Sequence, residues 1–264
     1  MTIFEAVLLG IIQGIAEFLP ISSSGHLVLL REVFQIDGDM LTFDIFVHVG
    51  SLAAILAVFW RDVWKLMRNP FCKITGLLIA GTVPAVVIGF ALRGVVEAPF
   101  FSSAIWLAAA FTITGTVLIF ADKFKKLHKE EREITYLDAL VVGFMQSLAL
   151  PPGISRSGMT ITGGLMRGIK RETAAHFSFM LAIIAIAGVG IFESFELVTG
   201  RVTIEYIGAA QMILGALASA LVGYLSIHLL LKLIKACKLR YFSYYVWALA
   251  GLIIIDHLIF NMRF

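Results

Sequence analysis

The chain has 264 residues, of which 59% are hydrophobic and only 15% are charged, and its mean hydropathy is +0.94. A water-soluble core does not need so many apolar residues, so the composition excludes an ordinary soluble domain and predicts an all-α polytopic membrane protein. The formal net charge of +3 comes from lysines and arginines grouped between apolar runs. Because the sequence has no basic face interleaved with aromatics, we expect no nucleic-acid partner.

The chain begins with an apolar segment, residues 3–19, and a shorter one, 27–34, separated by the sequence PISSSG. The second segment is too short to cross a bilayer, which takes about 20 helical residues. Irregular backbone at membrane depth is tolerated only where protein or a wet cavity surrounds it. We therefore expect a re-entrant helix–loop–helix hairpin. A cleavable signal peptide is not expected, because no basic flank precedes the first segment and Glu5, Gln13 and Glu17 interrupt it.

Six further apolar runs are long enough to span a membrane, and they fall into two sets of three. A charged stretch and a second broken segment separate the two sets. In chain order the expected elements are 43–60, 74–92, 101–121, the charged stretch 122–133, the broken segment 136–166, and the spans 174–192, 204–231 and 241–260.

The two broken segments are related in sequence. Residues 13–26 align without gaps on residues 146–159, at an offset of 133. The identities are Gln13/Gln146, Ala16/Ala149, Ile21/Ile154, Ser22/Ser155, Ser24/Ser157 and Gly25/Gly158. We interpret this as an internal duplication within one membrane domain, with repeats at about 1–121 and 136–264 joined by a loop at 122–135.

Each repeat then has one hairpin and three spans, so the second repeat enters the membrane inverted relative to the first. One side of this arrangement carries sixteen lysines and arginines, and the other carries only Arg31, Arg93, Arg201 and Arg263. The positive-inside rule makes the first side cytoplasmic and places both termini outside. Cys72 and Cys237 then face a reducing compartment without a disulfide. The two hairpins are expected to meet near the midplane.

The second break, PPGISRSGMT at residues 151–160, has the composition of an oxyanion site. Its prolines interrupt the helix, its glycines let backbone approach a ligand, and the restarting helix offers free N–H groups. With Ser155, Ser157, Thr160 and the guanidinium of Arg156, these groups suit a phosphate. An arginine within a membrane indicates function by default. A purely structural ion pair with Glu17 is less favoured, because it leaves the hydroxyls and glycines without a role.

The first break carries a serine–histidine arrangement. Ser22, Ser23 and Ser24 precede His26, which suggests a nucleophile with a general base or acid. Spacing does not identify the attacking serine, and the others would bind phosphate or cap the following helix. A buried histidine bonded to backbone is the simpler interpretation of His26 by itself. The presence of Glu17 and Arg156 favours catalysis.

Gln13 and Glu17 are four residues apart and share one helical face. Glu17 is a candidate to orient His26, to accept a proton, or to hold a divalent cation whose other ligands are phosphate oxygens. His48 in the first span either lines the cavity or is a satisfied core histidine.

The motifs GIIQGIAEFLPISSSGH and LALPPGISRSGMT resemble the undecaprenyl-diphosphatase, or bacitracin-resistance, family of bacterial membrane proteins. The segments FDIFVHVGSLAAILAVFWR, GTVPAVVIGFALRG and HFSFMLA extend the resemblance over nearly the whole chain. The resemblance implies removal of the terminal phosphate from undecaprenyl diphosphate, which recycles the lipid carrier for cell-wall synthesis. It also implies the bacterial plasma membrane, a site open to the extracytoplasmic side, a divalent cation (Mg²⁺ or Ca²⁺) and an inverted repeat with two re-entrant hairpins.

The resemblance also assigns roles to residues. Glu17 and His26 take acid/base and cation-related roles, Ser23 is the favoured nucleophile and Arg156 completes the catalytic set. The expected substrate-binding residues are Gln13, Ser22, Ser24, Gly25, Gly153, Ser155, Ser157 and Thr160, and the expected metal ligand is Glu17. The chain departs from the family pattern at two positions. Gln13 stands where many members have glutamate, and Ile184 stands where a proline often occurs.

A transporter or flippase of an anionic prenyl-phosphate lipid is the main alternative, since inverted repeats with broken helices are typical of secondary transporters. An intramembrane serine protease is disfavoured, because a peptide carbonyl has no use for Arg156. The sequence is compatible with a homo-oligomer without indicating one, and it leaves open whether serine or water attacks.

Overall fold

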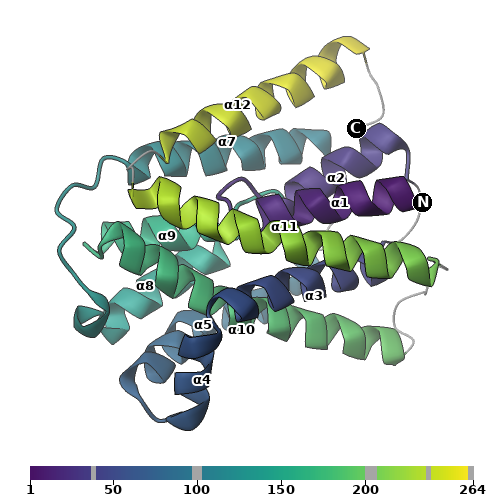
Figure 1. Cartoon of the computed structure of the whole chain (residues 1–264). Helices are drawn as coiled ribbons and strands as arrows, with labels where there is room; N and C mark the ends of the chain where they lie inside the picture. Colours follow the sequence, from purple (N-terminus) through teal and green to yellow (C-terminus); the bar gives the residue numbers. More distant parts are fainter. Residues whose placement is uncertain (37–39, 97–102, 200–206, 236–238, 261–264) are drawn as a thin grey trace.

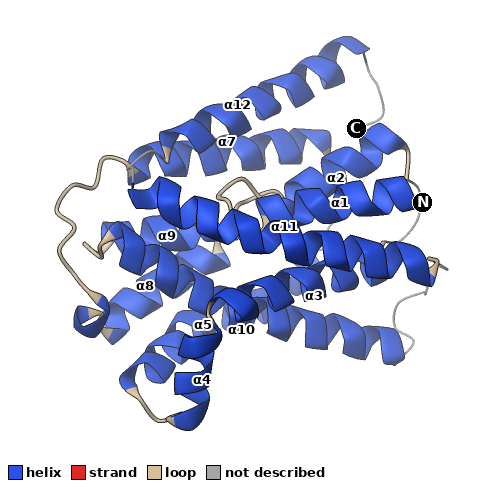
Figure 2. Ribbon diagram, viewed as in Figure 1, coloured by secondary structure: helices blue, strands red, loops and turns tan. Residues whose placement is uncertain are grey.

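The computed structural model describes residues 1–36, 40–96, 103–199, 207–235 and 239–260, and over these ranges it is helical without strands (Figures 1 and 2). The α-helices are α1 (Ile3–Ala16), α2 (Ser23–Phe34), α3 (Leu41–Val58), α4 (Trp60–Arg68), α5 (Lys73–Ala91), α6 (Arg93–Val96), α7 (Ala104–Ala121), α8 (Tyr136–Ser147), α9 (Arg156–Met166), α10 (Arg171–Val198), α11 (Ala209–Lys235) and α12 (Arg240–Ile255). A 3₁₀ turn, Glu131–Glu133, precedes α8, and a π-helical turn, Asp256–Phe260, follows α12.

Six of these helices are long and apolar enough to cross a membrane: α3, α5, α7, α10, α11, and α12 with its π-helical turn. They coincide with the six expected spans, which confirms an all-α multi-pass membrane protein. The main difference is α10, which extends over Arg171–Val198 and is longer than the expected 174–192. It runs without interruption through Ile184, the position at which the family pattern often has a proline.

The two expected broken segments are present as the helix pairs α1–α2 and α8–α9. Each second helix begins with a serine N-cap. The Ser22 hydroxyl accepts the N–H of Gly25, and the Ser155 hydroxyl accepts the N–H of Gly158. The first break spans residues 17–22, so the serines form the opening turn of α2, earlier than the expected start of the second apolar segment. The re-entrant course of the two hairpins in a membrane stays a prediction.

The first helix of each hairpin packs on a span of the opposite repeat. α1 lies along α11, and α8 lies along α5. Glycines allow these approaches, since a Cβ on Gly10 would collide with the carbonyl of Gly215, and one on Gly143 with the carbonyl of Gly81. Together these contacts bring the two breaks to the interior of the bundle.

The start of α1 and the end of α12 lie at one end of the bundle, and residues 122–135 lie at the other (Figure 1). At the second end the buried carboxylate of Asp138 binds Lys129 (2.9 Å) and Arg167 (2.7 Å). The short helix α4 was not expected from the sequence. It carries exposed Trp60 and Trp64 beside basic residues, as is typical of a helix at a membrane interface. Cys72 is a free thiol, and Cys237 lies outside the described residues.

Candidate active site

The two breaks meet through direct hydrogen bonds. The N–H of Gly153 in the second break donates to Ser24 Oγ in the first (3.1 Å), and Ser157 Oγ donates to the carbonyl of Leu19 (3.2 Å). Gly153 has φ +91°, a conformation that favours glycine, and Gly25 is packed against it too closely for a side chain. The N-termini of α2 and α9 therefore converge on one place, as the sequence predicts.

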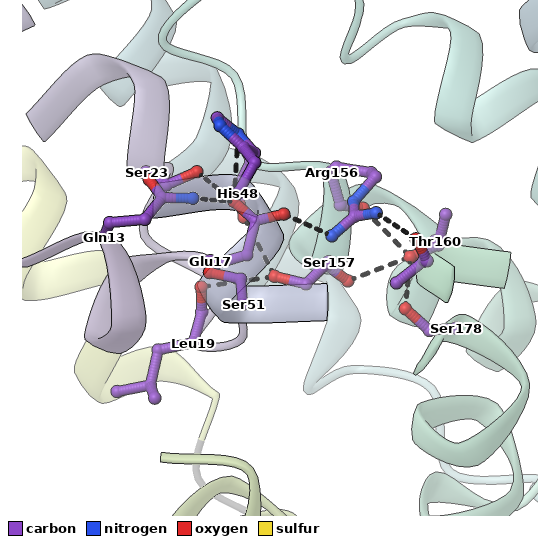
Figure 3. Close-up of polar contacts among 12 residues, drawn as sticks. Gln13, Glu17, Leu19, Ser23, His48, Ser51, Arg156, Ser157, Thr160 and Ser178 are labelled. Carbon is purple, nitrogen blue, oxygen red and sulfur yellow. Dashed lines mark hydrogen bonds and ion pairs between the residues drawn. The ribbon is translucent and has the colours of Figure 1, made fainter. Parts of the chain in front are cut away.

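Glu17, at the end of α1, is the centre of this meeting point (Figure 3). Its Oε1 accepts from Arg156 Nη2 at 2.7 Å. Its Oε2 accepts from Ser23 Oγ at 2.6 Å and from Gln13 Nε2 at 3.0 Å. A buried carboxylate requires such partners, because an unpaired charge away from water is strongly unfavourable. Both oxygens of Glu17 are thus bound by groups that the sequence places at the site.

Arg156 binds residues of both repeats, and its side chain stays partly exposed. One guanidinium nitrogen binds Glu17, and another donates to the carbonyl of Ala182 on α10 (3.3 Å). Its side chain is 20% exposed, against 7% for Glu17. The ion pair that the sequence alone left as a structural alternative is therefore formed, while part of the guanidinium stays accessible to a phosphate.

His26 is held away from Ser23. Its Nδ1 lies 2.6 Å from the carbonyl of Ser22, and its Nε2 lies 2.8 Å from the hydroxyl of Tyr245 on α12. The imidazole also stacks on the Tyr245 ring and meets Phe111 edge-on. Both ring nitrogens thus have partners, so the expected contact between Ser23 and His26 is absent here. The proton of Ser23 points to Glu17.

His48 lies at the site, as one of its two interpretations predicted. Its Nδ1 lies 2.7 Å from the carbonyl of Asp44, so that nitrogen must carry the proton as the donor. Its Nε2 is 3.9 Å from Glu17 Oε2, and its side chain is 30% exposed. The Asp44 carboxylate is in turn paired with Arg31 on α2. The imidazole is therefore fixed with Nε2 directed at Glu17.

The remaining expected binding residues form two matched hydroxyl pairs. Ser22 and Ser24 lie 3.4 Å apart at the start of α2, and Ser155 and Ser157 lie 3.3 Å apart at the start of α9. Thr160 differs from them, because its hydroxyl contacts Ser178 Oγ on α10 at 2.5 Å and the backbone of its own helix. The expected role of Thr160 in binding a phosphate would therefore require this contact to open.

Residues 6–252 match the family model described as Bacitracin resistance protein BacA. The chain belongs to the BacA family. It is 41% identical over 255 residues to the undecaprenyl-diphosphatase of Carboxydothermus hydrogenoformans, covering 97% of both chains. It is 42% identical over 254 residues to undecaprenyl-diphosphatase 4 of Bacillus cereus, covering 96% of this chain and 97% of the relative. Undecaprenyl-diphosphatase of Halothermothrix orenii is 40% identical over 258 residues, with 97% and 98% covered.

Three residues of this BacA-family site were not anticipated from the sequence. Thr114 on α7 accepts the N–H of Ser155 (3.1 Å), Ser178 binds Thr160, and Tyr245 binds His26. Each shares its span with other hydroxyl-bearing side chains. Nothing in the local sequence separates such a residue from ordinary helix packing.

The groups around Glu17 include few ligands for a divalent cation. Among the described residues, no three histidine, cysteine, aspartate or glutamate side chains are grouped to hold a metal. Glu17 is a single carboxylate, and the buried Gln13 Oε1 beside it has no hydrogen-bond partner. Mg²⁺ is commonly bound through one or two carboxylates together with substrate phosphates. The residues thus fit a cation that the substrate helps to hold.

Proposed function

We propose that this BacA-family chain is an undecaprenyl-diphosphatase, which hydrolyses undecaprenyl diphosphate to undecaprenyl phosphate and inorganic phosphate. The observation that carries the proposal is the arrangement at Glu17, where one carboxylate binds both a serine hydroxyl and a partly exposed arginine. A hydroxyl next to a carboxylate is a nucleophile beside a base, and the guanidinium is a clamp for phosphate. The names of the relatives support the same activity.

In this mechanism the diphosphate binds between Arg156 and the N-termini of α2 and α9. The hydroxyl pairs and free N–H groups surround its oxygens, and together they stabilise the charge that develops in the transition state. Glu17 takes the proton of Ser23, and Ser23 Oγ forms a bond to the terminal phosphorus. The anhydride P–O bond breaks and releases undecaprenyl phosphate, and water then frees the phosphate. A water in the place of the Ser23 hydroxyl would react in one step.

His26 is assigned a supporting part. Its contacts with the Ser22 carbonyl and with Tyr245 fix the turn that presents Ser23. Transfer of a proton by His26, which the resemblance implies, stays a prediction.

A divalent cation, Mg²⁺ or Ca²⁺, is part of the proposal. Glu17 and the amide oxygen of Gln13 would hold it together with the substrate. When bound, it would neutralise charge on the diphosphate.

The proposed location is the bacterial plasma membrane, with both termini and the open side of the site extracytoplasmic. The basic residues at the 122–135 end, including Lys129, Arg167 and Arg171, support that orientation. There the activity would recycle the carrier for cell-wall synthesis and confer bacitracin resistance. A homo-oligomer has no support beyond its compatibility with the sequence.

The test is phosphate release by the purified protein from undecaprenyl diphosphate, with Mg²⁺ or Ca²⁺ and with EDTA. Release that depends on the cation and disappears in Arg156→Ala would support the phosphatase. Unimpaired turnover by Arg156→Ala would overturn the assignment. None of the comparisons supports the transporter alternative, which would regain interest only if the lipid were bound and not hydrolysed.

A further inference from the structure

Two glycine contacts relate the halves of the chain in space. Gly10 on α1 lies against the carbonyl of Gly215 on α11, and Gly143 on α8 lies against the carbonyl of Gly81 on α5. Gly143 follows Gly10 by 133 residues, and Gly215 follows Gly81 by 134. The two contacts are therefore the same contact made by each repeat, and α5 and α11 are counterparts.

The adjoining interfaces do not follow this correspondence. α3 packs closely along α11, whereas its counterpart α10 contacts α5 only sparsely. At the α3–α11 interface, Gly50 lies against the carbonyl of Ala216, and the hydroxyls of Ser51 and Ser219 lie 2.9 Å apart. Small residues allow these two helices to approach.

At the spacing of 134 residues, larger side chains occupy the corresponding positions between α5 and α10. Ile184 stands where α3 has Gly50, and Thr82 stands where α11 has Ala216. A groove of about 220 Å³ separates the two helices at this level. Its lining residues are Ile79, Thr82, Val83, Val86, Val87 and Ile184. The hydroxyl of Thr82 is bonded to the carbonyl of Leu78 (2.8 Å), so the groove presents an apolar wall.

Contacts with neighbouring helices lie on either side of Ile184 along α10. On the side of the helix C-termini, Arg93 pairs with Glu196 (2.6 Å), and the rings of Phe90 and Phe192 meet at 6.0 Å. On the other side, Leu181 packs against Gly81. The groove therefore lies between these contacts, in the middle of two membrane-spanning helices.

The α5–α10 groove lies beside the polar site. Arg156 donates to the carbonyl of Ala182, two residues before Ile184 on α10. On the other wall, Leu150 of the second break packs against α5 at Gly89. A ligand whose anionic end is bound at Arg156 would place an apolar chain, extending in the plane of the membrane, in the groove.

We propose that the α5–α10 groove holds the isoprenoid chain of a prenyl diphosphate whose headgroup is bound at Arg156. This inference rests on the proposed phosphatase function and names the part of the protein that recognises the chain. A prenyl chain fits because it is a single apolar strand attached to a diphosphate, whereas most membrane lipids carry two chains and lack the second phosphate. The prenyl chain then occupies the space that the bulkier residues leave between α5 and α10.

Tryptophan substitutions in the groove provide the kinetic test. Val83→Trp and Val86→Trp fill the groove. The matched control is Leu217→Trp, because Leu217 is the counterpart of Val83 and lies on the exposed face of α11. We expect the groove variants to raise the KM for undecaprenyl diphosphate about tenfold or more, a loss of at least one decade in apparent affinity. Turnover of isopentenyl diphosphate, whose five-carbon chain is too short to reach the groove, should be unchanged, as should the control variant.

A photoreactive prenyl diphosphate, with a diazirine on its chain, gives a second readout that needs no variant. Mass spectrometry should find the label on residues 79–87 and at Ile184, and excess undecaprenyl diphosphate should suppress it. An unchanged KM in both groove variants, or labelling that undecaprenyl diphosphate does not suppress, would show that bulk lipid fills the groove and would overturn the inference. If the unmodified protein hydrolysed neither diphosphate, the proposed function itself would fail, which is a distinct result.

Discussion

Ser23 and Arg156 occupy corresponding positions in the two repeats, 133 residues apart, and they bind the two oxygens of one carboxylate. Each is the first residue of its helix, and each points to Glu17 at the end of α1 (Figure 3). The second helix of one hairpin thus begins with a hydroxyl and that of the other with a guanidinium. A substrate between them would face a nucleophile from one repeat and a positive charge from the other, a division of roles that neither hairpin could achieve alone.

Replacement of Arg156 should stop catalysis. Arg156→Ala is expected to lower kcat by at least about 10²–10³-fold, the usual effect of losing a charged transition-state contact. Arg156→Lys should retain little activity, because an ammonium cannot bind Glu17 and a phosphate with the same fork of donors.

Loss of Arg156 also leaves Glu17 unpaired, which would destabilise the protein by about 3–5 kcal/mol if the carboxylate stayed charged. The double variant Glu17→Gln/Arg156→Ala removes that charge and is the control for folding. Its thermal unfolding in detergent should resemble that of the unmodified protein while its phosphate release stays absent. Normal phosphate release by any of these variants would contradict the assigned role of Arg156.

Substitution of Ser23 should affect catalysis differently from substitution of the neighbouring Ser24. Ser23→Ala removes the hydroxyl bonded to Glu17 and is expected to lower kcat at least about a hundredfold, as for loss of a nucleophile or its close electrostatic support. Ser24→Ala removes the contacts with the Gly153 N–H and with the Ser22 hydroxyl, and it should affect KM more than kcat. Single-turnover phosphate release separates the two effects. If Ser23→Ala retained substantial turnover, water would be the attacking group.

Most of the architecture followed from sequence because bilayer thickness and backbone hydrogen bonding leave few solutions for a chain this apolar. The six spans and the two breaks were predicted at nearly their observed bounds. The convergence of the two breaks, with Glu17 and Arg156 between them, also followed, since inverted repeats bring their breaks together. The interfacial helix α4 was not predicted, because it is short and amphipathic and continues directly from a span.

The detailed partners in the site were less predictable. His26 was expected beside Ser23 from their separation of three residues, yet the turn of α2 directs its ring to Tyr245, which is 219 residues away in the chain. Thr114 and Ser178 contribute from long spans that are largely apolar. Such long-range contacts depend on which faces of the spans turn inward, and periodicity alone does not determine that in a helix that is apolar all round.

Substitution of Gln13 tests whether a divalent cation binds at Glu17. Gln13→Glu would place a second carboxylate beside Glu17, and a divalent cation gains affinity with each added charged ligand. We expect the Mg²⁺ or Ca²⁺ concentration for half-maximal activity to fall severalfold. The matched control is Gln146→Glu, at the corresponding position of the other repeat, which should leave that concentration unchanged. Equal effects of the two substitutions, or activity that EDTA does not reduce, would argue against a cation at Glu17.

Asp138 connects the 122–135 loop to the hairpin α8–α9 and should make stability depend on pH. Burial by itself would raise the pKa of Asp138, but hydrogen bonds from Lys129, from the Thr135 N–H and from Arg167 outweigh it and hold the pKa well below its ordinary value. A lowered folded-state pKa stabilises the protein above the unfolded pKa of about 4, and this stabilisation declines as the pH falls toward the folded pKa.

Asp138→Asn should therefore lower the unfolding temperature by several degrees at pH 7, because it leaves the cations Lys129 and Arg167 without their buried partner. The difference between the two proteins should narrow progressively below about pH 4, where the unfolded state begins to bind the proton that the native carboxylate still excludes. Glu172→Gln, which alters the exposed pair with Lys235, is the control and should change the unfolding temperature much less. A difference that stayed constant from pH 7 to pH 3 would mean that Asp138 acts through packing, and that its charge contributes nothing to holding the loop on the hairpin.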